Sequence, residues 1–321
     1  MKNLNRQAQS KGNLNTYDRN IYDRAFYYFL KIFAGGLPFF LLAIGVFLAK
    51  GSIPSLQKFD FSFILTKEWD PARDNYGVLS FIYGTAVSSL LALILAAPVS
   101  IFTALFLTEI APLRLQKVAS FFIEMLAAIP SVVYGLWGIY VLAPYLRIYV
   151  EPFLGKTLGF IPLFQGPPYG VGMLAAGVIL AIMIIPTITS VTKEVFLSIP
   201  TSYREAAMAL GATRWEVIKI AVLKSGEAGV LGAVILGLGR AIGETMAVTM
   251  VIGNRSDISL SLFAPAQTMS SVIANEYSEA TSTLHLASLI EIGLILFLSS
   301  FFVNSIARIF VWRATLKGSL R

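Results

Sequence analysis

The chain has 321 residues, of which 56% are hydrophobic and 13% charged, and its formal net charge at pH 7 is +7. A soluble protein carries about a quarter charged residues, so this composition excludes an ordinary soluble protein and indicates an integral membrane protein. The absence of cysteine excludes disulfides and cysteine-based metal sites, and a single histidine, His285, excludes a histidine-rich metal site within the chain.

The first twenty residues are polar, and the apolar stretch that follows starts too late and runs too long for a cleavable signal peptide. We therefore expect residues 1–25 to form a cytoplasmic N-terminal segment. Six apolar stretches follow, each near or above the roughly 20 residues that cross a bilayer as a helix. They lie at 26–49, 78–107, 118–146, 172–195, 228–252 and 285–311. The sequence predicts an all-α integral membrane protein with one six-span domain over 26–313 and a cytoplasmic tail at 314–321.

Three prolines lie inside the predicted spans, and each removes a backbone donor and can kink its helix. They are Pro98, Pro130 and Pro186. Beside Pro130, the side chains of Ser131 and Tyr134 are candidates to bind the backbone groups that a broken helix would free.

Lys and Arg predict the orientation of the spans, because they are enriched in cytoplasmic loops. The two termini and the loops after the second and fourth spans hold more than twice as many basic residues as the opposite side. Both termini are therefore expected in the cytoplasm, and the basic net charge requires no nucleic-acid partner.

The predicted cytoplasmic loop at about 196–227 shows two helix starts. Both have the Ser/Thr-x-x-Glu spacing of a capping box, and Gly211 between them fits the end of a helix. The two pairs are Ser202 with Glu205 and Thr213 with Glu216. We expect two short helices that meet at Gly211. The first has an alanine-rich face suited to a partner's groove, although a segment lying on the membrane surface is an equal alternative.

The fifth predicted span carries two charges, Arg240 and Glu244, within an otherwise apolar helix from Gly229 to Ile252. A spacing of four residues places both on one helical face. Each charge costs about 2.5–3.5 kcal/mol at membrane depth on insertion scales, which favours a function in a transport pathway. Arginine presents a fork of donors that suits an oxyanion, while Glu244 would neutralise Arg240 between passages and Thr245 would add a hydroxyl. A structural ion pair is the alternative.

A family resemblance decides between these alternatives. Glu205-Ala206-Ala207, followed by Gly211, resembles the EAA loop of ABC-importer permeases, which seats in the ATPase subunit. That family usually continues with Ile-x-Leu-Pro, whereas this chain has Ala221-Val222-Leu223-Lys224, so the exit of the loop departs from the pattern. Three further stretches resemble the phosphate-permease family PstC, and the resemblance covers roughly residues 76–313. The stretches are 103–109, 128–138 and 237–247.

The resemblance implies a type I ABC importer (MetI-like) fold and one half of a phosphate pathway in the cell membrane. The partners it implies are a second permease (PstA-like), an ATPase dimer (PstB-like) that uses the ATP, and an extracytoplasmic phosphate-binding protein (PstS-like). It implies no catalytic residue, cofactor or metal in this chain. Arg240, Glu244 and Thr245 are then expected to line the pathway. The residues expected to couple to the ATPase are Tyr203, Arg204, Glu205, Ala206, Ala207 and Gly211.

Several alternatives stay open at this level. The cargo could be another oxyanion, such as sulfate or molybdate, and an ion-coupled secondary transporter or a signalling scaffold would be a different class of protein. The segment Gly155-Lys156-Thr157 imitates the end of a phosphate-binding loop, but the required earlier glycine is Val150, so no nucleotide site is expected. His285 and Glu291 are expected near headgroups or water.

Overall fold

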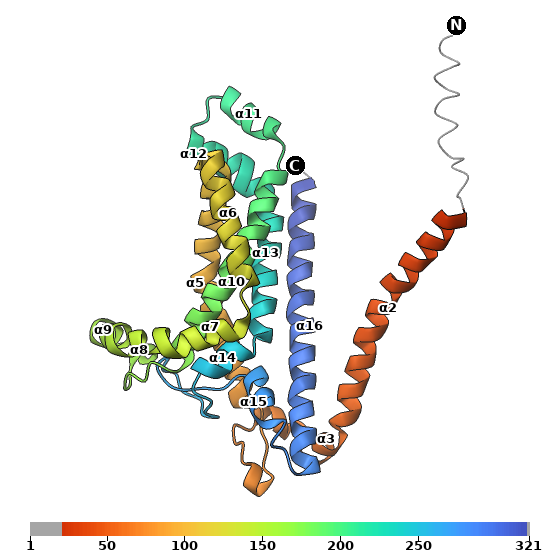
Figure 1. Cartoon of the computed structure of the whole chain (residues 1–321), viewed down its shortest axis with the longest axis vertical. Helices are drawn as coiled ribbons and strands as arrows, with labels where there is room; N and C mark the ends of the chain where they lie inside the picture. Colours follow the sequence, from red (N-terminus) through yellow and green to blue (C-terminus); the bar gives the residue numbers. More distant parts are fainter. Residues whose placement is uncertain (1–20, 320–321) are drawn as a thin grey trace. The chain divides into compact units, whose positions relative to one another are not determined.

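The computed structural model describes residues 21–319, and it consists of helices and the loops that join them (Figure 1). Most of the predicted N-terminal segment 1–25 and the last two residues of the predicted tail lie outside the described residues. Within the described chain, six helical stretches are long and apolar enough to cross a membrane, which confirms the predicted all-α membrane architecture. They are Asp23–Gly51, Leu79–Ile110, Ser131–Leu158, Met173–Ser198, Arg214–Gly243 and Thr283–Ile309.

The first of these helices, α2 (Ile21–Gly51), forms a unit of its own, and the second unit begins at Gly51. Its side chains from Asp23 to Ala43 are all exposed, and most of them are apolar or aromatic. A helix that is hydrophobic on every side is typical of a membrane span. The α2 surface therefore suits lipid or a neighbouring subunit.

The second unit contains the remaining elements, and these form the helical bundle that positions the candidate sites. They are α3 (Ile53–Phe59), α4 (Ser62–Leu65), η2 (Pro71–Arg73), α5 (Leu79–Leu105), η3 (Phe106–Ile110), α6 (Leu113–Ala128), α7 (Ser131–Trp137), η4 (Gly138–Leu142), α8 (Ala143–Tyr145), η5 (Leu146–Val150), α9 (Glu151–Leu158), η6 (Pro162–Phe164), α10 (Met173–Ser198), α11 (Thr201–Ala209), α12 (Arg214–Val217), η7 (Ile218–Leu223), α13 (Lys224–Gly243), α14 (Met246–Val251), α15 (Met269–Glu276) and α16 (Thr283–Ser319).

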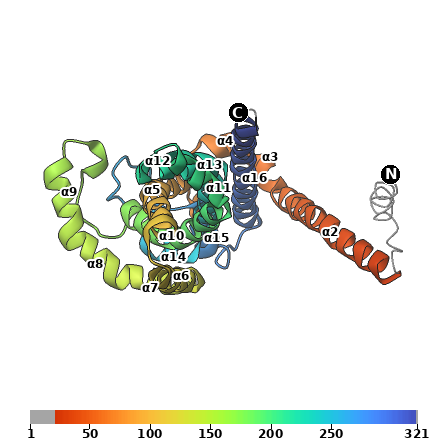
Figure 2. The same ribbon diagram turned by 90° about the horizontal axis from the view of Figure 1, so that it is seen from above.

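The helix α10 lies at the centre of this bundle, packed against α5 and α13, while α16 packs on the outer side of α13 (Figure 2). About two thirds of the residues in the most apolar 18-residue stretch of α10 are buried. The Ser100 hydroxyl of α5 donates to the Ile185 carbonyl of α10 at 3.2 Å. The two helices with the most extensive mutual contact are therefore also joined by a hydrogen bond. Pro98 and Pro186 remain inside uninterrupted helices.

The third predicted span, 118–146, was wrong as a single helix. The helix α6 ends at Ala128, Ile129 is extended (φ −65°, ψ 129°), and a new helix begins after Pro130. Proline disfavours helical geometry in the residue before it and supplies no N–H to the preceding turn, which explains the break. In Figure 1, α6 runs alongside α10, whereas α8 and α9 extend to one side, away from the bundle.

His285, which the sequence places near a membrane edge, lies in a cluster with residues from other parts of the chain. Its side chain is buried, and its Nε2 lies 3.0 Å from Glu276 Oε2, which also accepts a hydrogen bond from Trp69 Nε1 at 2.8 Å. The ring of Tyr76 stacks on the imidazole with centroids 5.4 Å apart. The loop before α5 folds over the start of α16, at the end of the bundle opposite α11 (Figure 1). Hydropathy alone does not predict this contact between two distant parts of the chain.

Glu291 is buried in protein, although water or headgroups were expected around it. It lies in α16 with an exposed fraction of 2%, beside Ser55 of α3, and its Oε2 is buried without a hydrogen-bond partner. The short helix α3 packs against α16 and covers this carboxyl group.

Candidate functional site: a broken span and a coupling segment

The fifth span is not one helix, which corrects the prediction of a continuous helix to Ile252. The helix α13 ends at Gly243, and Glu244 is extended (φ −68°, ψ 129°) before α14 begins at Met246. Two glycines in the last turn, Gly239 and Gly243, weaken the helix there. The freed carbonyl of Glu244 accepts a hydrogen bond from the Ser270 hydroxyl of α15 at 2.8 Å, so the break is stabilised by tertiary structure.

Arg240 and Glu244 therefore do not share one helical face. The Glu244 carboxylate accepts a weak hydrogen bond from the Ala247 amide at 3.4 Å, at the start of α14. The Arg240 guanidinium turns the other way, toward α10, where its Nη1 donates to Thr187 Oγ1 at 2.8 Å. No ion pair joins the two charges within the described residues. The predicted mutual neutralisation of Arg240 and Glu244 was wrong for this conformation.

Arg240, Glu244 and Thr245 are all partly exposed at this break. Irregular backbone at membrane depth is tolerated where it is buried in protein or lines a water-filled cavity. A guanidinium held by one neutral hydroxyl keeps further donors for another ligand, because arginine carries five N–H groups. The arrangement is thus able to bind an anion, and Thr187 is a participant that the sequence did not reveal.

The break in the third span packs directly against the break in the fifth. The Tyr134 hydroxyl donates to the Leu126 carbonyl at 2.8 Å, which spans the interruption at Pro130 and confirms the predicted role of Tyr134. Close packing of α7 on α14 depends on glycine, because a Cβ at Gly135 would lie 2.5 Å from Met250 Sδ and 3.2 Å from Ala247 Cα. The two interrupted spans therefore form one contiguous region beside Arg240.

The segment that the sequence assigns to ATPase coupling, here called the coupling segment, consists of α11 and α12, which meet at Gly211 as predicted. Gly211 has a positive φ of 81°, a conformation that glycine adopts without the steric cost of a side chain. The second capping box is confirmed: Thr213 Oγ1 accepts from the Glu216 amide, and Glu216 Oε2 accepts from the Thr213 amide at 2.8 Å. The predicted first capping box, Ser202 with Glu205, is wrong, because α11 begins directly after Pro200 and its start has no side-chain cap.

The exposed face of α11 carries most of the residues that the sequence assigned to ATPase coupling. Tyr203 and Met208 are 57% and 54% exposed, and Leu210 is 90% exposed. Glu205 and Ala206 are exposed and Ala207 is half-buried. Figure 1 shows α11 projecting beyond the ends of the long helices. Large apolar side chains in such a position are typical of a surface that binds a partner.

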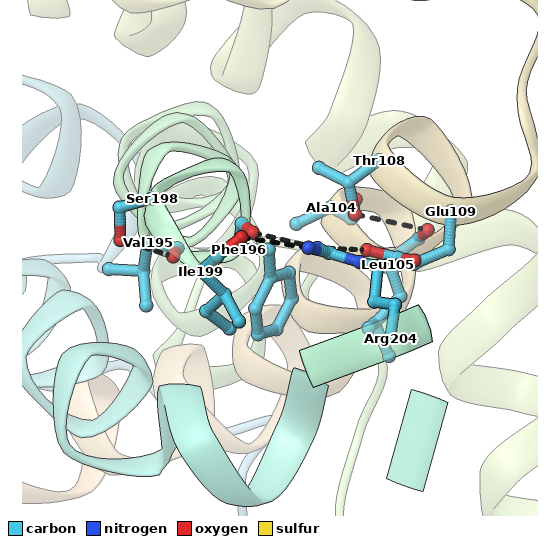
Figure 3. Close-up of polar contacts among 9 residues, drawn as sticks. All are labelled: Ala104, Leu105, Thr108, Glu109, Val195, Phe196, Ser198, Ile199 and Arg204. Carbon is cyan, nitrogen blue, oxygen red and sulfur yellow. Dashed lines mark hydrogen bonds and ion pairs between the residues drawn. The ribbon is translucent and has the colours of Figure 1, made fainter. Parts of the chain in front are cut away.

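Arg204 is the exception, because it turns back into its own chain (Figure 3). Its Nη2 lies 2.8 Å from Glu109 Oε1, and its Nε donates to Glu109 Oε2 at 3.2 Å. The same guanidinium donates to the carbonyls of Ile199 and Phe196 at 2.8 and 3.0 Å. Sequence reasoning missed Glu109 as a functional candidate, although Glu109 is the last residue of the stretch 103–109 that carries the family resemblance.

Comparison with known proteins identifies the family to which the chain belongs. Residues 100–315 match the family described as "Binding-protein-dependent transport system inner membrane component". Among curated proteins, the chain is 46% identical over 274 residues to the phosphate transport system permease protein PstC of Mesorhizobium japonicum, covering 84% of each chain. It is 44% identical over 301 residues to PstC of Xylella fastidiosa, covering 92% of this chain and 93% of that protein.

Among solved structures, the fold is similar to a bacterial ABC transporter involved in the import of the acidic polysaccharide alginate, with a TM-score of 0.56. The match covers 90% of this chain and 99% of that chain at 16% identity, so it bears on the fold alone. It supports the predicted importer-permease fold. By its family match and its relatives, the chain belongs to the inner membrane components of binding-protein-dependent ABC importers, multi-pass membrane permeases, and within them to the PstC family.

Proposed function

We propose that this chain is a phosphate permease that forms one half of the translocation path of an ATP-driven importer. The observation that carries the proposal is Arg240, a partly exposed guanidinium at the break of a membrane-spanning helix, held by one hydroxyl of a second span. An arginine fork matches the oxygens of phosphate, and its charge persists at every physiological pH. The relatives that carry the name PstC support phosphate as the anion.

The pathway that we propose runs beside Arg240, Glu244 and Thr245. Glu244 places a negative charge next to the site without pairing with Arg240, so it limits how tightly an anion is held. A conducting site needs such moderate binding, because the ion must leave as well as enter. Thr245, in the break itself, offers a further hydroxyl.

The partners that we propose are a second permease, an ATPase dimer and an extracytoplasmic phosphate-binding protein. Two exposed features support them. The α11 surface offers Tyr203, Glu205 and Ala206 to an ATPase subunit. On α13, a Cβ at Gly232 or Gly243 would meet no heavy atom within 4 Å, so this side is open to a second permease. We further propose that α11 lies in the cytoplasm with both termini, that the chain holds no cofactor, and that ATP is used by the partner.

The test is uptake of radiolabelled phosphate by the complete transporter in proteoliposomes. Arg240→Gln should abolish uptake while the complex still assembles, and Arg255→Gln, at an exposed arginine in the loop after α14, should retain it. Sulfate and molybdate in excess should not compete with labelled phosphate. Uptake that survives Arg240→Gln would refute the pathway. Absence of phosphate uptake by the parent complex would refute phosphate as the cargo, and competition by sulfate or molybdate would refute selectivity for phosphate. Uptake without the ATPase would point to a secondary transporter.

A further inference from the structure

The guanidinium of Arg204 joins three separate elements at the end of the bundle that carries the coupling segment. Arg204 itself belongs to α11, its carbonyl partners Phe196 and Ile199 lie at the end of α10, and its carboxylate partner Glu109 lies in η3, which continues α5 (Figure 3). Within the described residues, this is the ion pair that links the coupling segment to a transmembrane helix.

Both charged side chains are largely withdrawn from solvent, with exposed fractions of 19% for Arg204 and 10% for Glu109. Removing charges from water is unfavourable unless the geometry of the pair is good and the remaining groups are bonded. Here the Glu109 carboxylate accepts two hydrogen bonds from the Arg204 guanidinium. The guanidinium also donates to the Phe196 and Ile199 carbonyls, which lie at the end of α10, where no further helical turn supplies an N–H group to them. The link is therefore specific in geometry as well as in charge.

The two helices that Arg204 reaches are the pair that forms the centre of the bundle. α5 and α10 pack along their length and share the hydrogen bond from Ser100 to Ile185. A displacement of α11 therefore reaches α5 through the Arg204 side chain, and it reaches α10 through the same side chain and through the two residues that join α10 to α11. Lysine at position 204 would keep the charge but would lack the fork needed to bind the carboxylate and the carbonyls together.

We propose that Glu109 is a positioning residue that, through Arg204, fixes the coupling helix α11 to the ends of α5 and α10 and so transmits ATPase movement to the pathway. The inference rests on the proposed contact of α11 with an ATPase subunit, and it is independent of which anion is carried.

The first test measures coupling. In the complete transporter, Glu109→Gln keeps the shape of the side chain but removes its charge, and Arg204→Lys keeps the charge but removes the fork. Each should raise the ATP hydrolysed per anion transported by at least about fivefold, the lower range of measured coupling effects. The double variant should be no worse than the single ones, because both act on one link. The matched control Glu194→Gln, at an exposed carboxylate of α10, should leave the ratio unchanged.

The second test measures position and does not depend on transport. The chain contains no cysteine, so spin labels are introduced cleanly at Ser202 of α11 and Leu113, the exposed first residue of α6 just after η3. The distance between the labels in the assembled complex should be narrow in the wild type and broad in Glu109→Gln. An exchange of charges, Glu109→Arg with Arg204→Glu, should not restore coupling, because the new carboxylate would face the Phe196 and Ile199 carbonyls.

Unchanged coupling and an unchanged distance distribution in Glu109→Gln would overturn the inference. Full rescue by the charge exchange would overturn the requirement for the arginine fork at position 204, whereas it would leave the link between positions 109 and 204 in place. If the wild-type complex transports no phosphate, the proposed cargo fails, whereas the label distances and the hydrolysis rate still decide the role of Glu109.

Discussion

Arg240 donates from its Nη1 to the hydroxyl of Thr187 at 2.8 Å, and this bond joins the interrupted fifth span to the continuous fourth. The acceptor lies directly after Pro186 in α10, on the helix around which the bundle is built. The pathway candidate is thus oriented from the most deeply packed helix of the chain. Its fork keeps donors free because the partner is a neutral hydroxyl and not a carboxylate.

Thr187 is expected to set the orientation of Arg240. Thr187→Val removes the acceptor at nearly constant volume, and a hydrogen bond to a charged group contributes about 1.5–3 kcal/mol. Phosphate uptake should fall by roughly tenfold or more, since about 1.4 kcal/mol corresponds to one factor of ten. Thr187→Ser, which retains the hydroxyl, should recover most of the uptake. Equal rates for the valine and serine variants would show that the bond does not matter for transport.

Gly135 is expected to be required for the packing of α7 on α14. In Gly135→Ala the added Cβ would meet Met250 Sδ and the backbone of Ala247, and such overpacking costs typically about 1–3 kcal/mol. The thermal midpoint of the purified chain in detergent should therefore fall. Gly232→Ala adds a methyl group where no heavy atom lies within 4 Å and should not lower it. Equal midpoints for the two variants would contradict the close approach.

Tyr76 is expected to make stability depend on alkaline pH. Burial raises the pKa of its phenol to about 12 from 10.0, so the folded chain retains a proton that the unfolded chain loses. The stabilisation is fully present below pH 10 and is lost as the pH rises toward 12. It amounts to about 2–3 kcal/mol from the two-unit shift.

Tyr76→Phe should remove this slope in unfolding measurements between pH 9 and pH 12. The matched control is Tyr140→Phe, at a tyrosine with an exposed fraction of 76%, which should retain the slope of the parent chain. If the free energy of unfolding of Tyr76→Phe still falls between pH 9 and pH 12, groups other than Tyr76 cause the pH dependence.

Thr213 is expected to hold the second helix of the coupling segment in place. Thr213→Ala removes one half of a capping box whose other half is Glu216, and loss of such a cap costs about 1 kcal/mol. Amide exchange of residues 213–217 should become several-fold faster. Ser202→Ala is the control, because the Ser202 side chain makes no cap at the start of α11. Equal acceleration in both variants would argue against the second box.

The sequence was sufficient where the physics is local. Six apolar stretches follow from composition over about 20 residues. The turn at Gly211 and the Thr213–Glu216 box depend on groups within four positions of one another. The break at Pro130 was also foreseeable as a kink, because proline acts on its own neighbours.

The tertiary structure decided the features that involve distant partners. No proline marks the break at Glu244, which is held by Ser270 of another helix, and the partner of Arg240 lies 53 positions away. Helical spacing placed Arg240 and Glu244 together only while the helix was continuous. A sequence pattern records which groups need partners, whereas folding across the bundle determines which partners they reach.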